Sequence, residues 1–444
     1  MPQKKKTVTT QDIVNTIIKN EYYSKRLVFN NDNDKFLWYN EDNNYIYLHK
    51  KEYCEFLFNF MEEFFPDHNV STHLEKEVYH FLMIRTPRQI EKEDEEYISF
   101  EDKLFNLDTF EPEEKDKNII TSFNLPFKYD EVEKAEAPRF MEFLSEIFVN
   151  NAKETDYELI NLVQEMCGSF FIPDMECSQA WFWVGEGGNG KSVFAKVIQS
   201  IFPDKICSSM NLQTMTTSRW SMAHLVGKRL NISAEEESKY VSSDKFKALV
   251  FGDLMHAEEK FGKTFEFTPK AKYVFLTNNM PALGSVDTGL KRRIQIIPFK
   301  RMFSRTEMDR KLIGKLKQEL PGVVKWMLEG ARNITEKDYL FSQAEATNKE
   351  IERFIMESNS SVEFVKELYD VEPNSRITTG DLYAHYKSWC YDNGRKPLSR
   401  NNFIRDVKRE MELPVKTVRV GNSSTTGFGL ILKANVYEEG DIDF

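Results

Sequence analysis

A glycine-rich loop between an apolar segment and an amphipathic segment constrains this chain more than any other feature of its sequence. The apolar run Trp181–Val184 is followed by Gly-Glu-Gly-Gly-Asn-Gly-Lys-Ser at residues 185–192. The next apolar residues recur at the spacing of one buried helix face: Val193, Phe194, Val197, Ile198 and Ile201. This order predicts a strand, a tight loop and a helix on a mostly parallel sheet, and therefore an α/β fold.

The same loop predicts a nucleotide site that takes ATP and Mg²⁺. Glycines let backbone N–H groups turn toward phosphates, and the following helix directs the positive end of its dipole at them. Lys191 adds a charge for the terminal phosphates, and Ser192 offers a hydroxyl ligand to Mg²⁺. The nucleotide-binding set is Gly185, Gly187, Gly188, Asn189, Gly190, Lys191, Ser192 and Val193. A chance glycine-rich turn between a strand and a helix is the alternative.

Hydrolysis of a nucleotide also needs carboxylates at the end of a neighbouring strand. The strand-like run Leu225–Ser233 leads directly into Ala-Glu-Glu-Glu. Glu235 is expected in the metal shell and Glu236 in water activation, and Glu237 is able to replace either. A solvated acidic loop is the alternative.

Two further segments offer polar groups for the same site. The buried-strand pattern from Lys272 ends at Asn278, whose amide is suited to the attacking water or the terminal phosphate, although Asn also favours turns for backbone reasons. Arg292 and Arg293 precede the apolar run Ile294–Phe299. Either arginine is a candidate to neutralise charge in the transition state, commonly from a neighbouring subunit, and surface arginines at a strand edge are the alternative.

Length and charge limit the remaining possibilities. At 444 residues the chain is expected to form two or three domains. A net charge of −11 argues against nucleic-acid binding by the whole surface, so any such site must be local. The five cysteines lack the paired spacing of a zinc site. No apolar run is long enough to cross a bilayer and no signal-like N-terminus is present, which predicts a cytoplasmic protein.

The first hundred or so residues mix helical and strand-like patterns without a catalytic constellation. Residues 36–39 and 45–48 predict a hairpin, and Tyr53 begins a helical pattern that extends to Phe64. The charged stretches at 91–96 and 111–117 are expected to be exposed linkers or loops.

Taken in order, these elements resemble the superfamily 3 helicases, in particular the phage and poxvirus primase-helicase branch that includes replication proteins of phage satellites and staphylococcal mobile islands. The motifs that carry the resemblance are Leu125–Asp130, Ala137–Phe140, Gly185–Ser192, Phe265–Pro269, Leu276–Asn279, Arg292–Ile294 and Leu320–Trp326. The resemblance implies an AAA-like ATPase that forms a hexameric ring and moves 3′ to 5′ along single-stranded DNA. It also places a pore hairpin at 259–263, with Lys260 and Lys263 on the DNA backbone. An ordinary exposed hairpin is the alternative.

The C-terminal part looks like a winged helix. Helices are predicted at Thr379–Asp392 and Ser399–Met411, and a hairpin at Lys416–Val420 and Gly427–Lys433. The second helix carries the cations of a DNA-contacting face: Arg400, Arg405, Lys408 and Arg409. Many such modules bind proteins instead.

The expected organisation is an α+β helper domain at 1–125, the AAA-like core with its preceding helical segment at 126–335, a linker at 336–360 and the winged helix with an acidic tail at 361–444. No primase domain precedes the helper region, so primer synthesis is not expected.

The function favoured is a DNA helicase that replicates a phage or mobile element in a bacterial host, with possible initiation or loading partners. One alternative is an ATP-switched origin-binding initiator without unwinding activity. Another is a P-loop regulator with no nucleic-acid role.

Overall fold

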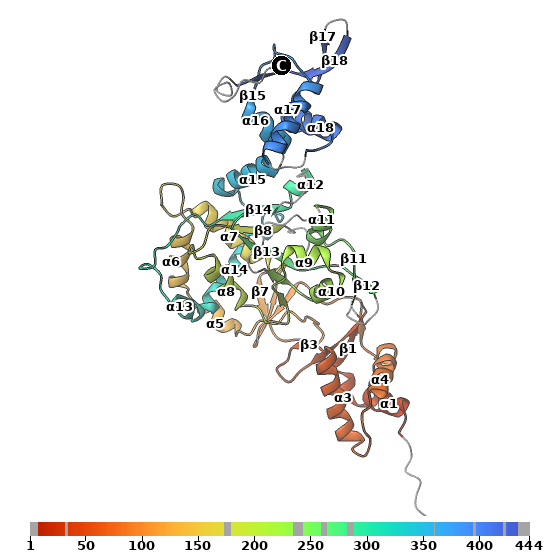
Figure 1. Ribbon diagram of the computed structural model, residues 1–444. Coiled ribbons are helices and arrows are strands. Elements are labelled where there is room, and N and C mark those ends of the chain that lie inside the picture. The colour runs from red at the N-terminus through yellow and green to blue at the C-terminus, as the bar shows by residue number, and fades with distance from the viewer. Residues whose placement is uncertain are drawn as a thin grey trace, which may run out of the picture.

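The computed structural model describes residues 8–31, 34–172, 179–233, 243–258, 264–281, 288–358, 360–393, 397–420 and 423–433. An N-terminal unit, a central body and a C-terminal unit follow one another along a long molecule (Figure 1). Within these ranges, no helix combines the length and apolar character that a membrane span requires.

The N-terminal unit packs helices on a small four-stranded sheet of order β3-β2-β1-β4. Its elements are α1 (Thr10–Lys19), α2 (Glu21–Ser24), β1 (Leu27–Asn30), β2 (Lys35–Tyr39), β3 (Tyr45–Tyr47), α3 (Lys50–Phe64), α4 (Thr72–Arg85) and β4 (Gln89–Ile90). The predicted hairpin is confirmed as the antiparallel pair β2–β3, and the helical pattern from Tyr53 is confirmed as α3.

The charged stretch at 91–96 is a loop, as expected, but it is exposed only at Glu91, Lys92 and Glu96. Glu93 is buried, and its carboxylate accepts a hydrogen bond of 2.6 Å from the backbone N–H of Ser122. The carboxylate of Glu95 lies 2.9 Å from the ammonium of Lys270 in the central body. Carboxylates with dedicated partners are held inside a structure, so this segment ties the N-terminal unit to the central body.

The second charged stretch, 111–117, also differs from the expectation. It contains β7 (Glu111–Glu113), which pairs with β6 (Leu104–Asn106), itself paired with β5 (Tyr97–Ser99). The half-buried Lys115 donates hydrogen bonds to Asn44 and Ser99. Its stem is therefore covered although the surrounding sequence is highly charged.

The central body contains a five-stranded, wholly parallel sheet of order β14-β8-β13-β10-β9, as the sequence predicts. Its strands are β8 (Ala180–Val184), β9 (Cys207–Ser208), β10 (Leu230–Ile232), β13 (Lys272–Thr277) and β14 (Ile294–Pro298). β10 is shorter than the predicted run from Leu225, because a 3-10 turn and Gly227 at φ 74° occupy its first part.

Helices cover both faces of this sheet, so alternate side chains of each strand enter different cores. Trp181 and Trp183 of β8 face one core, and Ala180 and Phe182 face the other. The first core is formed with α5 (Tyr129–Lys134), α6 (Pro138–Ile147), α7 (Tyr157–Ser169), α8 (Lys191–Gln199), α13 (Leu312–Lys317) and α14 (Leu320–Thr335). The second is formed with α9 (Leu212–Thr217), α10 (Arg219–Met222), α11 (Ser243–Phe251), α12 (Thr288–Lys291) and α15 (Glu345–Ser358). Burial on both faces explains the nearly continuous apolar strands.

Two glycines let α7 and α14 cross closely behind the sheet. A Cβ atom on Gly330 would lie 2.1 Å from the backbone oxygen of Gln164, and one on Gly168 would lie 2.1 Å from the backbone nitrogen of Ala331. Because both obstacles are backbone atoms, no side-chain rotation relieves them. This crossing fixes the helical layer on which α8 rests.

An antiparallel hairpin projects from the central body between α11 and β13. It consists of β11 (Met255–Glu258) and β12 (Thr264–Phe267), with Glu258 opposite Thr264. Figure 1 shows it on the side of the body that faces the N-terminal unit.

The C-terminal unit is a small α/β arrangement around one apolar core. Its elements are α16 (Ser360–Leu368), β15 (Tyr369–Val371), β16 (Ile377–Thr378), α17 (Thr379–Asp392), α18 (Arg400–Glu410), β17 (Lys416–Val420), β18 (Ser423–Phe428) and β19 (Leu430–Leu432). Both predicted helices are present. The predicted pairing of Lys416–Val420 with Gly427–Lys433 is wrong: β17 pairs with β18, and β19 pairs with β15. The polar run in β18 hides a strand from any search for alternating apolar residues.

Replacing Gly330 with alanine is expected to destabilise the central body by about 3 kcal/mol or more, since two backbones must separate. Thermal unfolding followed by circular dichroism measures the effect. Gly314→Ala is the matched control, because a Cβ atom at Gly314 in α13 meets nothing within 4 Å. This control is expected to be neutral or stabilising by up to about 1 kcal/mol. Equal unfolding temperatures for the two variants would contradict the close crossing.

Lys115 predicts a pH dependence of stability. Burial lowers the pKa of its ammonium from 10.5 to about 8. Between these values the unfolded chain binds more protons than the folded chain, so the stability contributed by this residue rises with pH across that window. Below pH 8 the full cost of burying the charge is present. Unfolding temperatures of wild type and Lys115→Met, measured from pH 7 to 10, should show a rise in the wild type that the variant lacks. Lys51→Met, at a highly exposed position, should keep the wild-type profile.

Candidate functional site

The glycine-rich loop joins the carboxyl end of β8 to the start of α8 at one edge of the parallel sheet. Gly188 and Gly190 have φ values of 78° and 85°, a left-handed conformation that side chains rarely adopt. A Cβ atom on Gly190 would lie 2.6 Å from Ile147, whereas one on Gly187 would meet nothing within 4 Å. The loop therefore needs glycine for its shape at one position and leaves open space beside another, as a cradle of backbone N–H groups requires.

Lys191 is the first residue of α8, and its side chain folds back across the edge of the sheet. Its ammonium donates to the backbone oxygen of Gly185 at 2.8 Å, to that of Thr277 at 2.7 Å and to the side-chain oxygen of Asn278 at 3.3 Å. Only 4% of the residue is exposed. The predicted phosphate-binding lysine and the predicted sensor amide are therefore in direct contact.

Asn189 is buried and shapes the loop. Its side-chain nitrogen donates to the backbone oxygen of Phe299 at 3.3 Å, and its side-chain oxygen accepts from the backbone N–H of Lys191 at 3.2 Å. The backbone N–H of Phe303 donates to the oxygen of Gly188 at 2.9 Å. The segment after β14 thus braces the loop, a role that sequence analysis missed because the braces are backbone groups.

Ser192 is exposed in the first turn of α8, and Val193 is half-buried against the core. Within the described residues no group of three or more His, Cys, Asp or Glu side chains is placed to hold a metal. A metal here would take the Ser192 hydroxyl together with other oxygen ligands, which suits the coordination of Mg²⁺.

The predicted acidic residues Glu235, Glu236 and Glu237 lie outside the described residues. The strand that leads to them is nevertheless placed. β10 runs parallel to β13, and the backbone N–H of Ser233 donates to Val274 at 2.9 Å. The chain therefore leaves β10 at the same edge of the sheet as Lys191.

Arg292 and Arg293 lie at the opposite edge of the sheet, where β14 begins. The backbone oxygen of Arg293 accepts from the N–H of Ala180, the first residue of β8. Since β8 has five residues, about 16 Å of strand separates these arginines from the loop. Arg292 is exposed, whereas the guanidinium of Arg293 donates to Gly289 at 2.8 Å and lies over the ring of Phe251. The structure does not bring either arginine to the loop of its own chain.

The nucleic-acid candidates fall into two groups. Lys260 and Lys263 lie outside the described residues, between β11 and β12 in the sequence. On α18, Arg405 is 62% exposed and Lys408 is exposed. Arg409 and Arg405 lie 3.8 Å and 3.5 Å from the buried carboxylate of Asp406, and Arg400 donates to Thr379 at 3.0 Å. The helix keeps an exposed basic face while one carboxylate offsets part of its charge.

Two protein-family models match parts of the chain. Residues 183–293, which include the glycine-rich loop, the hairpin and both arginines, match a family described as "Family of unknown function (DUF5906)". Residues 356–430 match a family described as "Poxvirus D5 protein-like".

Two curated relatives are viral proteins. Over 366 residues the chain is 21% identical to "Putative helicase 121R" of Invertebrate iridescent virus 3, an alignment that covers 71% of this chain and 37% of the relative. Over 241 residues it is 23% identical to "Putative helicase 022R" of Frog virus 3 (isolate Goorha), covering 48% of this chain and 24% of the relative. The chain thus spans well under half the length of either relative. With the Poxvirus D5 match, they support a relationship to primase-helicases of the superfamily 3 type.

Among solved structures, the apo form of the NrS-1 C-terminal region aligns with a TM-score of 0.47 and 14% identity, covering 90% of this chain and 95% of that one.

Proposed function

We propose that this protein is an ATP-dependent DNA helicase of the superfamily 3 type, which assembles as a hexameric ring and unwinds duplex DNA during replication of a phage or mobile element. The observation that carries the proposal is the contact of Lys191 with Asn278 across the carboxyl edge of the sheet. A lysine at the start of a helix after a glycine-rich loop serves terminal phosphates, and an amide one strand away is placed to respond when they change.

The nucleotide chemistry is assigned to groups along this edge. The backbone N–H groups between Gly185 and Ser192 bind the phosphates of ATP, and Lys191 neutralises their charge. Ser192 and Glu235 hold Mg²⁺, which supplies charge neutralisation for phosphoryl transfer. Glu236 orients the attacking water, a role that Glu237 is also able to take.

The arginine that completes the site comes from a neighbouring subunit. Neither Arg292 nor Arg293 lies at the edge that holds the loop, so action within one chain is excluded by the length of the strands. Arg292 is the better candidate because it is exposed, whereas Arg293 is held by Gly289 and Phe251. A ring places one protomer's exposed arginine beside the next protomer's loop.

DNA contacts are assigned to two elements. Lys260 and Lys263, between β11 and β12 in the sequence, grip the backbone of the translocated strand. The C-terminal unit has the order α16-β15-β16-α17-α18-β17-β18-β19, and its sheet β16-β18-β17 supports its assignment as a winged helix. Arg400, Arg405, Lys408 and Arg409 on α18 then face duplex DNA. The proposed partners are replication-initiation or loading proteins, and the proposed location is the cytoplasm of a bacterial host.

A second candidate is an ATP-switched origin-binding initiator that does not unwind DNA. The exposed basic face of α18 favours it, since recognition needs only that surface. A strand-displacement assay on a forked duplex separates the candidates: ATP hydrolysis without displacement under any loading condition would support the initiator.

Lys191→Ala is expected to lower ATP hydrolysis at least about 100-fold and to abolish strand displacement, because the charge on the terminal phosphates loses its partner. Phosphate release and displacement of a labelled strand are the measurements. Lys196→Ala, at an exposed position on the same helix, is the matched control and should keep both activities. Undiminished hydrolysis by Lys191→Ala would rule out the nucleotide site.

The Arg292→Ala variant should also lose ATP hydrolysis. Mixing it with the Lys191→Ala variant tests whether Arg292 acts on the loop of a neighbouring subunit. In mixed rings of Lys191→Ala and Arg292→Ala protomers, some interfaces combine an intact Lys191 with an intact Arg292. Phosphate release by the mixture should therefore exceed that of either variant alone. A mixture no more active than its parts, in the presence of confirmed subunit exchange, would contradict an arginine supplied in trans.

A further inference from the structure

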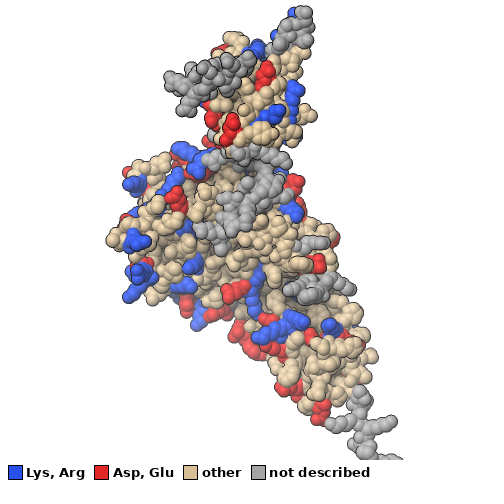
Figure 2. Space-filling view, in the orientation of Figure 1, with Lys and Arg blue, Asp and Glu red and all other residues tan. Residues whose placement is uncertain are grey.

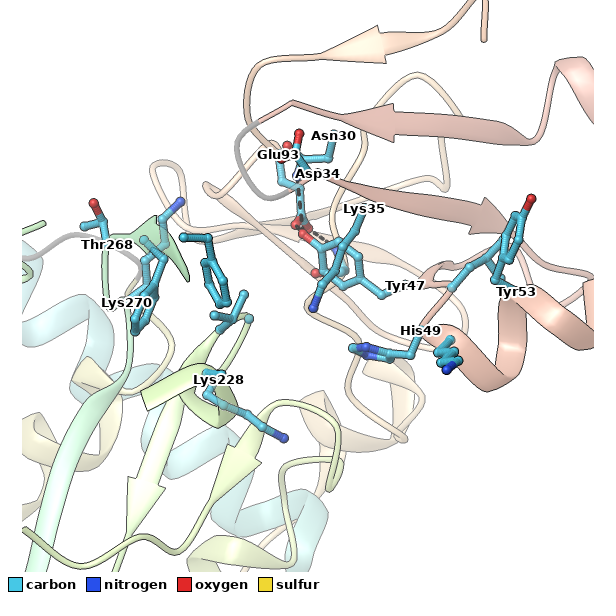
Figure 3. Close-up of a pocket in the computed structure, with 18 of the residues that line it drawn as sticks. Asn30, Asp34, Lys35, Tyr47, His49, Tyr53, Glu93, Lys228, Thr268 and Lys270 are labelled. Carbon is cyan, nitrogen blue, oxygen red and sulfur yellow. Dashed lines mark hydrogen bonds between the residues drawn. The ribbon is translucent and has the colours of Figure 1, made fainter. Parts of the chain in front are cut away.

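A cleft of about 870 Å³ lies between the N-terminal unit and the central body, away from the glycine-rich loop. Figure 3 shows Lys35 and His49 on the wall formed by the N-terminal unit and Lys228 and Lys270 on the wall formed by the central body. A smaller pocket of about 250 Å³ shares Lys35 and His49 with it and extends to Lys205. The two pockets are adjacent, since their linings also share Tyr47, Ser122, Val226 and Gly227, and together they are called the cleft.

Positive charge is concentrated in the smaller pocket. Lys35, His49 and Lys205 line it, and no Asp or Glu is among its described lining residues. Lys205 lies 3.3 Å from Glu52 just outside, and Lys228 donates to two backbone oxygens at 2.8 Å and 3.0 Å. In the space-filling view, Lys and Arg side chains gather at this junction with Asp and Glu side chains beside them (Figure 2). The larger pocket is of mixed sign, with six Lys and Arg and five Asp and Glu residues in its lining, so the excess of cations is confined to the smaller pocket.

The neighbouring positive charges and burial disfavour the protonated forms of His49 and Lys228. Burial and the neighbouring Lys35, Lys205 and Lys228 lower the pKa of His49, while Glu52 acts in the opposite sense. Burial also lowers the pKa of Lys228. An anion in the cleft would relieve this repulsion, because an opposite charge favours the protonated forms.

Of the five carboxylates that line the larger pocket, Glu93 and Glu95 have partners that hold its walls together. Glu93 accepts from the N–H of Ser122 and from the hydroxyl of Tyr47. Glu95 pairs with Lys270 at 2.9 Å and lies 3.6 Å from Arg229. These contacts preform the cleft, so an incoming anion does not have to assemble it.

The cleft continues to the base of the β11–β12 hairpin. Phe265, Phe267 and Thr268 line the same pocket as Lys35 and Lys228. Any strand gripped at the hairpin therefore has a basic groove directly beside it.

We propose that this cleft binds the phosphate backbone of the single-stranded nucleic acid that passes the hairpin. The proposal rests on the proposed function, which places a strand at that hairpin. Cations on both walls match a chain of repeated negative charges, and the half-buried Tyr47 offers an aromatic surface beside them. A single small anion would leave most of the cleft unfilled.

The test compares two double variants of equal charge. Lys35→Gln with Lys228→Gln removes one cation from each wall, and Lys25→Gln with Lys51→Gln removes two exposed lysines elsewhere on the N-terminal unit. Binding of a fluorescent oligothymidylate is measured by anisotropy across a salt series, with thermal unfolding as the control for folding. Two lost phosphate contacts should reduce the salt slope by about 1.4 and weaken binding about 25-fold near 0.1 M salt. The control pair should bind as the wild type does.

Photocrosslinking locates the strand independently of any substitution. An iodouracil oligonucleotide bound to the wild type should crosslink to peptides that contain Tyr47 or the turn at 226–228. Crosslinks confined to the hairpin and α18, or an unchanged salt slope in the cleft variant, would overturn the proposal. So would a cleft variant that loses binding to an acidic polypeptide but keeps binding to the oligonucleotide.

Failure of the cleft and failure of the proposed function are distinguishable. If the wild type hydrolyses ATP and displaces strands while the cleft variant binds DNA normally, only the cleft assignment falls. If the wild type binds no oligonucleotide at all, both fall.

Discussion

The ammonium of Lys191 joins the ends of two adjacent strands, and the arrangement of the candidate site depends on this contact. Val184 of β8 and Thr277 of β13 are directly paired, so the residues that follow them leave the sheet at the same level. Lys191 reaches oxygen atoms on both sides of that step. A buried ammonium needs such acceptors, because an unsatisfied charge away from water is costly. Movement of the lysine toward a phosphate would release Asn278 at the same moment.

The contact between Lys191 and Asn278 can respond to a phosphate only if this edge of the sheet is held rigidly. Both faces of β8 and β13 are buried, so neither strand is able to tilt without disturbing a core. Behind one face, the glycines at 168 and 330 bring α7 and α14 into backbone contact. In front, Phe299 and Phe303 hold the loop through backbone groups. These surroundings fix the loop. In the sequence they are visible only as glycines and as alternating apolar residues.

Features that depend on local sequence patterns could be predicted from the sequence. The loop at 185–192, the strand before it, the helix after it and the parallel sheet all follow from periodicity and glycine placement. The contact between Lys191 and Asn278 could be expected only as proximity at one edge, because the order of strands is not encoded locally. The polar strand Ser423–Phe428 lacks the alternation that marks a strand. Glu93 and Glu95 have the composition of a linker, and only tertiary partners distinguish them from one.

The cleft residues were missed for the same reason. Lys35 and His49 belong to the N-terminal unit and Lys228, far along the chain, belongs to the central body, so no motif connects the two walls. An isolated lysine in a sequence gives no sign of a binding site. These lysines form a candidate site only because the fold places them on facing walls.

The long shape of the molecule separates the two surfaces proposed to contact DNA. The hairpin and the cleft lie toward the N-terminal unit, whereas α18 lies in the unit at the other end (Figure 1). Because the central body stands between them, a strand held at the hairpin is not read by α18 of the same chain unless the DNA bends around that body. The two surfaces therefore suit different proposed tasks, contact with duplex DNA for α18 and tracking of a single strand for the hairpin and the cleft. Only the second surface lies on the same body as the loop, so coupling to nucleotide hydrolysis is most direct there.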